Sequence, residues 1–124
     1  MKRITRDNME EFLGHYHDFR DSLIKTVVYD CDQAKIELII DTFWRGEVKL
    51  NQENKYESSK KKIKMVFYEV ESVSVKEMFS WDYISGAYLK YIKLHNKEYL
   101  CFADNDNDPS FYCVCESIEY EEIS

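Results

Sequence analysis

Residues 22–44, SLIKTVVYDCDQAKIELIIDTFW, contain the two segments that decide the fold. In each segment apolar and polar side chains alternate, and β-branched residues dominate the first, which is the pattern of a β-strand. The polar stretch at residues 30–33 between them favours a turn. The sequence therefore predicts a β-hairpin with strands at 22–30 and 34–44.

The same pattern recurs along the rest of the chain. Strands are predicted at 62–70, 87–94, 98–103 and 110–120, because alternation and flanking turn residues agree in each segment. The segment at 62–70 is apolar on both faces, so we expect it to be a central strand. Short connections between successive strands favour an antiparallel meander that closes into a sandwich or half-barrel, rather than a parallel sheet.

Two short helices are predicted from capping-box spacing, in which a polar residue is followed three positions later by Glu. Asp7 with Glu10 opens a helix at about 8–14, for which Gly14 is a stop signal. Ser74 with Glu77 opens a second helix between two groups of strands. Residues 51–60 are predicted to be a polar surface loop. The expected fold class is therefore mainly β with two short helices.

The composition indicates one globular domain that spans residues 1–124. The 124 residues are 44% hydrophobic, 33% charged and 15% aromatic, which allows one well-filled core. No apolar run approaches the ~20 residues needed to cross a bilayer. The first thirty residues lack the basic start and apolar stretch of a signal peptide. We therefore expect a cytoplasmic protein with no membrane partner.

The negative charge is concentrated late in the chain. Residues 1–62 hold 12 Lys or Arg and 12 Asp or Glu, whereas residues 63–124 hold 5 and 12, so the net charge of -7 comes from the second half. Residues 98–124 contain eight acids and no Lys, Arg or His. Such a block repels phosphate backbones and attracts basic proteins. Nucleic acid is therefore not an expected partner, although the acids could also serve solubility alone.

Aromatic side chains accompany these acids in the last strand. The chain has ten Tyr, seven Phe and two Trp, and Tyr112 and Tyr120 alternate with Glu116 and Ile118 along what is expected to be one face. Tyr side chains among acids are typical anchors of protein interfaces, but they also suit a wet sheet face. The candidate partner-binding residues are Asp104, Asp106, Asp108, Tyr112, Glu116, Glu119, Tyr120 and Glu121.

No residue pattern indicates a metal, a cofactor or a catalytic group. The four cysteines form no C-x-x-C pair and are expected to be free, buried thiols. Residues 104–108 begin like a calcium loop, but Pro109 and Cys115 occupy the positions where an EF-hand needs Gly and Glu. His15 and His17 are not four residues apart, as a helical metal pair would be. We therefore predict no metal site, no cofactor and no catalytic residue.

Residues Phe19-Arg20-Asp21-Ser22-Leu23-Ile24, which run into the strand at 25–29, resemble the pattern F-[HR]-D-S-x-[ILV]. Some small bacterial β-rich proteins open with this pattern, among them immunity proteins of polymorphic toxin systems. The resemblance implies a cytoplasmic antitoxin that binds and occludes one toxin domain without catalysis. Arg20 stands where His is more usual, so no role of that histidine is carried over. Asp21 and Ser22 are expected to fix the turn before the strand.

Three functional hypotheses follow from these observations. The first is a non-enzymatic binding protein, monomeric or weakly dimeric, that neutralises a basic toxin domain. The second is a small-molecule-binding or enzymatic β-barrel, with aromatic residues around a cavity and a His or Asp acting there. The third is a structural subunit of a larger assembly. A solid core with an exposed face of acids and tyrosines favours the first, and a deep apolar pocket with a histidine and a carboxylate favours the second.

Overall fold

A computed structural model describes residues 1–42, 49–50, 56–57, 61–77 and 83–123. Seven strands form one sheet, and their bounds are β1 (Lys2–Arg3), β2 (Leu23–Asp30), β3 (Lys35–Thr42), β6 (Lys61–Val75), β7 (Tyr88–Leu94), β8 (Lys97–Ala103) and β9 (Phe111–Ile123). Two short strands, β4 (Lys49–Leu50) and β5 (Tyr56–Glu57), pair separately. One α-helix, α1 (Met9–His15), and a single turn, η1 (His17–Phe19), precede β2.

Every strand pair is antiparallel, which confirms the predicted mainly β fold class. The spatial order is β2-β3-β6-β9-β8-β7, and β1 lies beside β9. The chain therefore crosses from β6 to the far edge at β7 and returns through β8, so that β9 is inserted between β6 and β8. This is a Greek-key connection, and it makes β9 a central strand.

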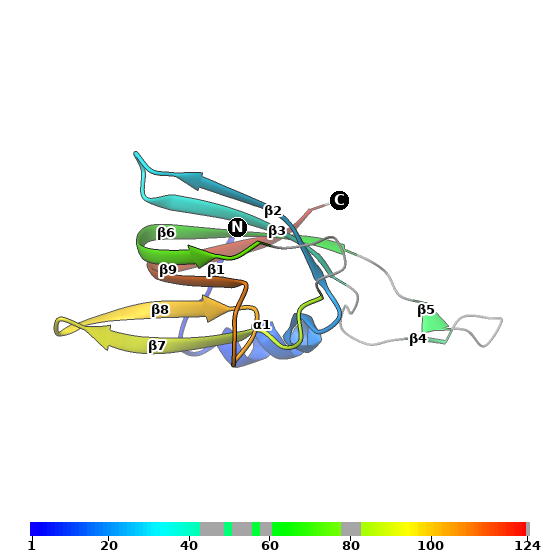
Figure 1. Ribbon diagram of the computed structural model, residues 1–124. Helices are drawn as coiled ribbons and strands as arrows, with labels where there is room; N and C mark the ends of the chain where they lie inside the picture. The colour runs from blue at the N-terminus through cyan, green and yellow to red at the C-terminus, as the bar shows by residue number, and fades with distance from the viewer. Residues whose placement is uncertain (43–48, 51–55, 58–60, 78–82, 124) are drawn as a thin grey trace.

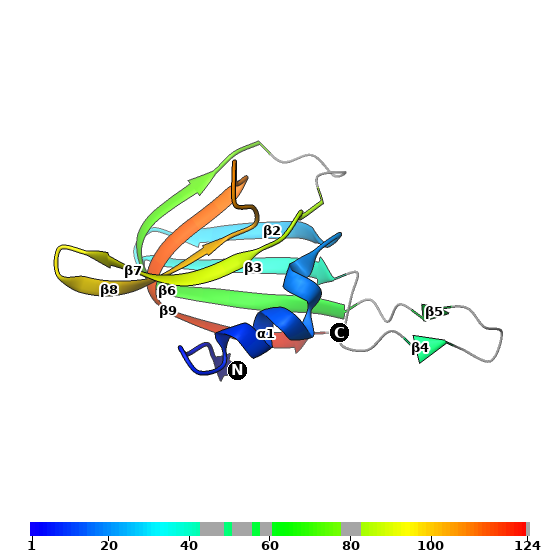
Figure 2. The same cartoon turned by 90° about the horizontal axis from the view of Figure 1, so that it is seen from below.

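Strands β6 and β9 are long and bent, and each belongs to two layers of the fold (Figures 1 and 2). The first layer contains β1, β2, β3 and the parts of β6 and β9 at residues 61–68 and 118–123. The second layer contains β7, β8 and the parts at residues 70–75 and 111–115. A β-bulge lies between Val70 and Ser72, next to Glu69 with a φ of 50°. Bulges bend strands, so this irregularity marks the corner between the layers.

The core lies between these two layers. Alternate residues of β3, including Ile36, Leu38 and Ile40, point into it and are almost fully buried. At its centre Phe67 and Phe111 have ring centroids 5.6 Å apart, and Phe102 contacts both rings. We infer that the alternation visible in the sequence is caused by one face of each strand covering this core.

A second aromatic group joins α1 and η1 to the core. The rings of Phe12 and Tyr16 have centroids 5.6 Å apart, and Phe19 stacks on Tyr16 at 5.2 Å. Phe12 also contacts Tyr120 of β9, with 4.3 Å between centroids. The helix begins at Met9 after Asn8, whose side chain accepts the Thr5 N–H instead of capping the helix. The predicted capping box therefore does not set the helix start, and α1 continues through Gly14 to His15.

The prediction of a second helix is wrong at its start. Ser74 and Val75 belong to β6, where they pair with Tyr112 and Phe111 of β9. Val73 packs against the core, so the ladder with β9 outweighs the local capping pattern. The remainder of that predicted helix falls partly on residues 78–82, outside the described residues. Within the predicted loop at 51–60, residues 56–57 form β5.

Backbone conformation is unusual at the turn between α1 and β2. His17, Asp18 and Phe19 have φ of 53°, 55° and 55°, and Asp21 has 62°. L-residues rarely adopt this left-handed region, which costs roughly 1–2 kcal/mol per residue. Burial of Phe19 and three backbone hydrogen bonds hold the turn: Ala87 to Asp18 (2.7 Å), Asp21 to Ile84 (2.9 Å) and Ile84 to Ser22 (2.8 Å). These bonds anchor the turn that contains residues 17–22.

Candidate functional site

The eight candidate residues from the sequence do not form one surface. Asp104, Asp106 and Asp108 lie in the loop between β8 and β9. Along β9, Tyr112 faces outward from the second layer, Glu116 lies at the corner, and Glu119 and Glu121 face outward from the first layer, opposite Val66 and Lys64. Tyr120 faces inward, against Phe12. Tyr112 and Tyr120 were expected on one face and lie on opposite faces.

A change of phase in β9 explains this outcome. Phe111, Cys113 and Cys115 point into the core, and so do Ile118 and Tyr120 beyond the corner. The inward residues therefore change from odd to even numbers at residues 116–117. Simple alternation from Tyr112 to Tyr120 does not continue through an irregularity of this kind.

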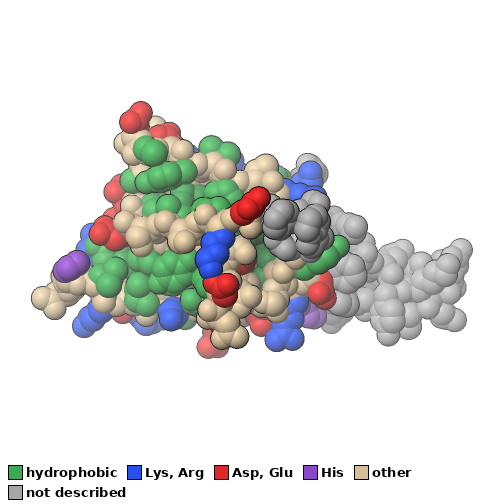
Figure 3. All heavy atoms as spheres, viewed as in Figure 1, with side chains coloured by type: hydrophobic (Ala, Val, Ile, Leu, Met, Phe, Trp, Pro, Cys, Tyr) green, Lys and Arg blue, Asp and Glu red, His purple; other side chains and the backbone are tan. Residues whose placement is uncertain are grey.

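Ion pairs with basic residues from elsewhere in the chain compensate several of the late acids. Glu98 pairs with Arg6, Asp108 with Lys76, and Glu116 with Lys97. Glu122 lies 4.0 Å from the Lys61 ammonium. The space-filling view in Figure 3 accordingly shows acidic and basic side chains interspersed on the visible face. The acidic block of the sequence is therefore not an acidic block in space.

Asp104 has a structural role in the loop before β9. It is buried, and its Oδ1 accepts the backbone N–H of Phe111 at 3.1 Å. Its own backbone N–H donates to the Phe111 carbonyl at 3.2 Å. Asp104 also lines a small pocket of about 210 Å³ with Ser110 and Tyr83. The hydrogen bonds indicate that Asp104 closes the loop, as Asp commonly does in turns.

The outer face of the second layer holds a buried thiol between two tyrosines. A hydrogen bond to Cys101 is the largest cause that raises the pKa of Tyr112, to about 12, and burial adds to it. Burial raises the pKa of the Cys101 thiol, and this outweighs its hydrogen bonds with Tyr112 and Tyr88. A thiol with a raised pKa is a poor nucleophile. Cys101 is therefore suited to packing rather than to covalent chemistry.

Cys113 and Cys115 are also buried, whereas Cys31 is exposed. A hydrogen bond to Cys115 and burial raise the pKa of Cys113, and both side chains lie in the core. All four thiols are free, and the prediction of buried cysteines is confirmed for Cys101, Cys113 and Cys115. It is wrong for Cys31, which is exposed in the turn between β2 and β3.

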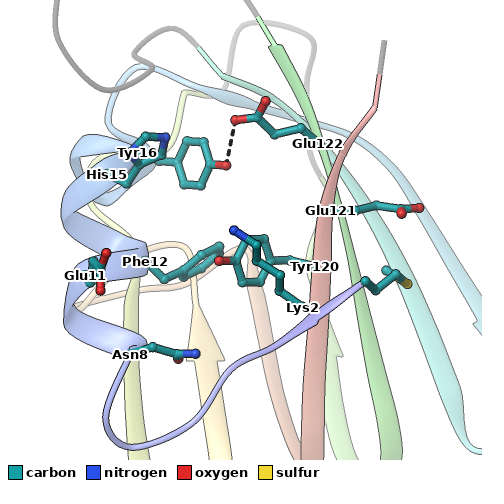
Figure 4. A pocket seen from close by; sticks show the side chains of 10 residues that line it. Lys2, Asn8, Glu11, Phe12, His15, Tyr16, Tyr120, Glu121 and Glu122 are labelled. Carbon is teal, nitrogen blue, oxygen red and sulfur yellow. Dashed lines mark hydrogen bonds between the residues drawn. The ribbon is translucent and has the colours of Figure 1, made fainter.

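A groove of about 760 Å³ lies between α1, β1 and the end of β9 (Figure 4). Aromatic rings of Phe12, Tyr16 and Tyr120 form its floor. The helical spacing of four residues places Phe12 and Tyr16 on the inner side of α1. Tyr120 reaches the same space from β9, so the floor is made by segments that are far apart in the sequence.

Polar side chains surround this aromatic floor. The Tyr16 hydroxyl donates to Glu122 Oε1 at 3.0 Å, and the His15 ring lies edge-on to Tyr16 with 4.7 Å between centroids. Glu11 lies on α1 to the left of Phe12, and Glu121 extends from the far side of β9, away from the helix (Figure 4). Within the described chain, Lys2 is the one Lys or Arg that lines the groove.

Only some of the residues that line the groove were predicted as candidates from the sequence. Of the eight candidates, Tyr120 and Glu121 line it. Glu11, Tyr16 and Glu122 were not singled out, and His15 was considered only for metal binding. Glu11 and His15 share a helical spacing of four, as do Phe12 and Tyr16, and that spacing is the one signal in the sequence. Nothing local connects α1 to the end of β9.

The described residues offer no constellation for metal binding. Across the described ranges, no three His, Cys, Asp or Glu side chains are grouped as metal ligands. In the same part of the chain, no helix has the length and apolar character needed to cross a membrane. The groove can therefore be considered from its own side chains, which offer aromatic faces, carboxylates and one imidazole.

Comparisons with models of protein families, with curated proteins and with solved structures each found no match to the chain.

Proposed function

We propose that this chain is a non-enzymatic binding protein that holds a basic segment of a protein partner in the groove between α1 and β9. The observation that carries the proposal is an aromatic floor flanked by the carboxylates of Glu11 and Glu122, with Lys2 as the one cationic side chain among the described lining residues. Aromatic faces attract Lys and Arg side chains through cation–π contacts, and carboxylates pair with them. Such a groove suits a cationic peptide segment.

The resemblance at Phe19-Arg20-Asp21-Ser22 supports a toxin domain as the partner class. Under this proposal the chain is an immunity protein that occludes a basic toxin domain in the bacterial cytoplasm. The net charge of -7 favours association with a basic protein and disfavours nucleic acid. Binding alone is sufficient for this role, so no catalytic residue is required.

The proposal is tested with Glu11→Lys, using the protein encoded by the neighbouring reading frame as the probe. Glu11 is exposed and forms no ion pair with any described residue, so the reversal should leave the fold intact. We expect association to slow by about tenfold or more at low salt, and the defect to shrink as salt rises. Stopped-flow or biolayer measurements of the association rate provide the readout.

Glu10→Lys is the matched control for this experiment. Glu10 is also exposed in the first turn of α1, but it does not line the groove. Its reversal to Lys changes the net charge by the same amount as Glu11→Lys. If both reversals slow association equally, the effect comes from the overall charge of the protein and not from the groove. A wild-type association rate for Glu11→Lys would contradict the proposal.

A double reversal of Glu116 and Glu119 to Lys tests the alternative location given by the sequence. These residues lie at the corner and on the outer face of the first layer, and neither lines the groove. If the partner binds there, this double variant should lose association rate while Glu11→Lys does not. The reverse order of effects supports the groove.

A small-molecule or enzymatic site is the second candidate for the same groove. The observation that favours it is His15 beside Tyr16, whose hydroxyl is bonded to the Glu122 carboxylate. Such a set can exchange protons with a bound ligand. A compound that raises the melting temperature of the wild type but not of His15→Gln would support this candidate. If His15→Gln leaves binding of the protein partner unchanged, His15 serves the small-molecule site and not partner binding.

A further inference from the structure

Strand β2 forms one edge of the sheet, and its outer side is not paired with any described residue. It is also the most exposed of the long strands, since none of its residues is buried. Val28 and Tyr29, which are 55% and 48% exposed, are adjacent on it. An exposed edge strand with apolar side chains is a template for pairing with another strand.

The regular part of this edge is short and well defined. The pairing with β3 shifts between Ile24 and Thr26, so Lys25 lies in a bulge. Beyond the bulge, residues 26–30 pair with β3 without interruption. Bulges and lysines block edges, so the bulge restricts an incoming strand to residues 26–30.

Opposite charges stand at the two ends of this segment. The Lys25 Nζ lies 3.8 Å from Asp41 Oδ2, and Asp30 is opposite Lys35 in the register with β3. Lys25 and Asp30 therefore both belong to the outer face of the first layer. One Asp30 oxygen accepts the backbone N–H groups of Asp32 and Gln33 in the turn. When two copies of the segment run antiparallel, the Lys25 end of each meets the Asp30 end of the other.

We propose that β2 pairs with β2 of a second copy of this chain, about a two-fold axis that passes through Val28. In this register Val28 faces Val28 of the second copy, Val27 faces its Tyr29, and Thr26 faces its Asp30. Each pair then has both members on the same face of the joined sheet, as antiparallel pairing requires. The result is one continuous sheet across two copies.

Charge and symmetry favour a second copy over an unrelated strand. The same patch serves both sides of a two-fold interface, so one Lys25–Asp30 attraction is made twice. A strand from the basic partner proposed above would instead bring cations to Lys25. The interface is confined to residues 26–30, so we expect a weak dimer, with a dissociation constant between about 10 µM and 1 mM.

The first test is sedimentation equilibrium of the full chain with Val28→Lys as the variant. The substitution places two ammonium groups on the axis, and the dimer should weaken by about tenfold or more. Val75→Lys is the matched control, because Val75 is 49% exposed on β6. This control should leave the dimer unchanged. Far-UV circular dichroism and melting temperature confirm that both variants fold.

The second test exchanges the charges between two variants. Lys25→Asp carries acids at both ends of the segment, and Asp30→Lys carries lysines at both ends. Each variant alone should be monomeric at concentrations where the wild type is dimeric. An equimolar mixture should form a heterodimer, because both end contacts are then attractive. General loss of stability in either variant would not produce this rescue.

A wild type that remains monomeric up to about 1 mM would overturn the proposal, since an edge-to-edge interface of this size should be detectable there. It is equally overturned if Val28→Lys and Val75→Lys have the same effect, or if the charge-exchanged mixture stays monomeric. The groove is lined by α1, β1 and β9 and not by β2. Failure of the dimer therefore leaves the proposed function untouched, and the Glu11→Lys experiment stays independent.

Discussion

The two halves of β9 have the same backbone pairing with β6 but different environments. In residues 111–115 the inward Phe111 and the outward Val114 are both almost fully buried. In residues 118–123 only Ile118 is buried, and the outward side chains include Glu119 and Glu121, the second of which lies opposite Lys64 of β6. The comparison teaches that the strand's neighbours determine whether its outer face is core or charged surface. Removing buried volume should therefore be costly in the first half, and changing charge should be cheap at and beyond the corner.

Phe111→Ala should produce the largest effect. Phe111 is fully buried, and its ring contacts those of Phe67 and Phe102. Large-to-small changes at such sites leave a cavity and cost about 3–5 kcal/mol. Urea unfolding followed by fluorescence measures the loss. A change below about 1 kcal/mol would mean that the second layer does not enclose this ring.

Val114→Thr tests whether the outward face of the first half is truly buried. Val114 is 2% exposed, and the added hydroxyl should lower the free energy of unfolding by about 1–3 kcal/mol. Val75→Thr makes the same replacement at an exposed position and should change stability by less than about 0.5 kcal/mol. Equal losses in both variants would contradict the burial of Val114.

Alkaline pH should lower the free energy of unfolding through Tyr112, which lies in the first half of β9. Hydrogen bonding to Cys101 raises the pKa of Tyr112 to about 12 in the folded state, against 10.0 for an ordinary tyrosine. Above pH 10 the unfolded chain loses this proton while the folded chain keeps it, so stability should fall between pH 10 and 12. Tyr112→Phe should show a smaller fall in melting temperature over that range. Part of the fall will remain, because burial also raises the pKa of Tyr68 and Tyr88.

Lys97→Ala should have the smallest effect. Lys97 pairs with Glu116 at the corner, but its side chain is 57% exposed. Exposed ion pairs contribute about 0–1 kcal/mol, and salt screens them. Chemical unfolding at low and high salt should therefore differ little from the wild type. A loss well above 1 kcal/mol would show that this pair holds the β7–β8 hairpin to the bend.

The hairpin of β2 and β3 could be predicted because its signal is local. Alternation in each strand and a polar turn between them lie within one stretch of chain. The second helix was mispredicted because Ser74 and Val75 pair with Tyr112 and Phe111, far along the chain, and a capping pattern carries no information about that ladder. The fold class follows from periodicity, whereas the extent of each strand depends on its partners.

The groove could not be predicted for a related reason. Its floor joins Phe12 of α1 and Tyr16, which directly follows the helix, to Tyr120 of β9, and these are brought together only when β1 and the helix pack against the last strand. The change of phase at residues 116–117 also separates Tyr112 from Tyr120. Alternation relates residues on the same side of the corner to one another, but it does not relate residues on opposite sides of it.

The central position of β9 has a consequence for synthesis of the protein. β9 pairs with β1, β6 and β8, all of which the ribosome makes before it. At about 5–20 residues per second, several seconds separate the emergence of β3 from that of β9. Throughout that interval the inward faces of β3 and β6 are not covered by a complete second layer. The β7–β8 hairpin is also not yet joined to β6, because β9 lies between β6 and β8 in the sheet. The nascent chain must therefore keep these apolar surfaces from associating with other molecules until β9 is inserted, and assembly of the sheet is completed at the end of translation of this domain rather than progressively.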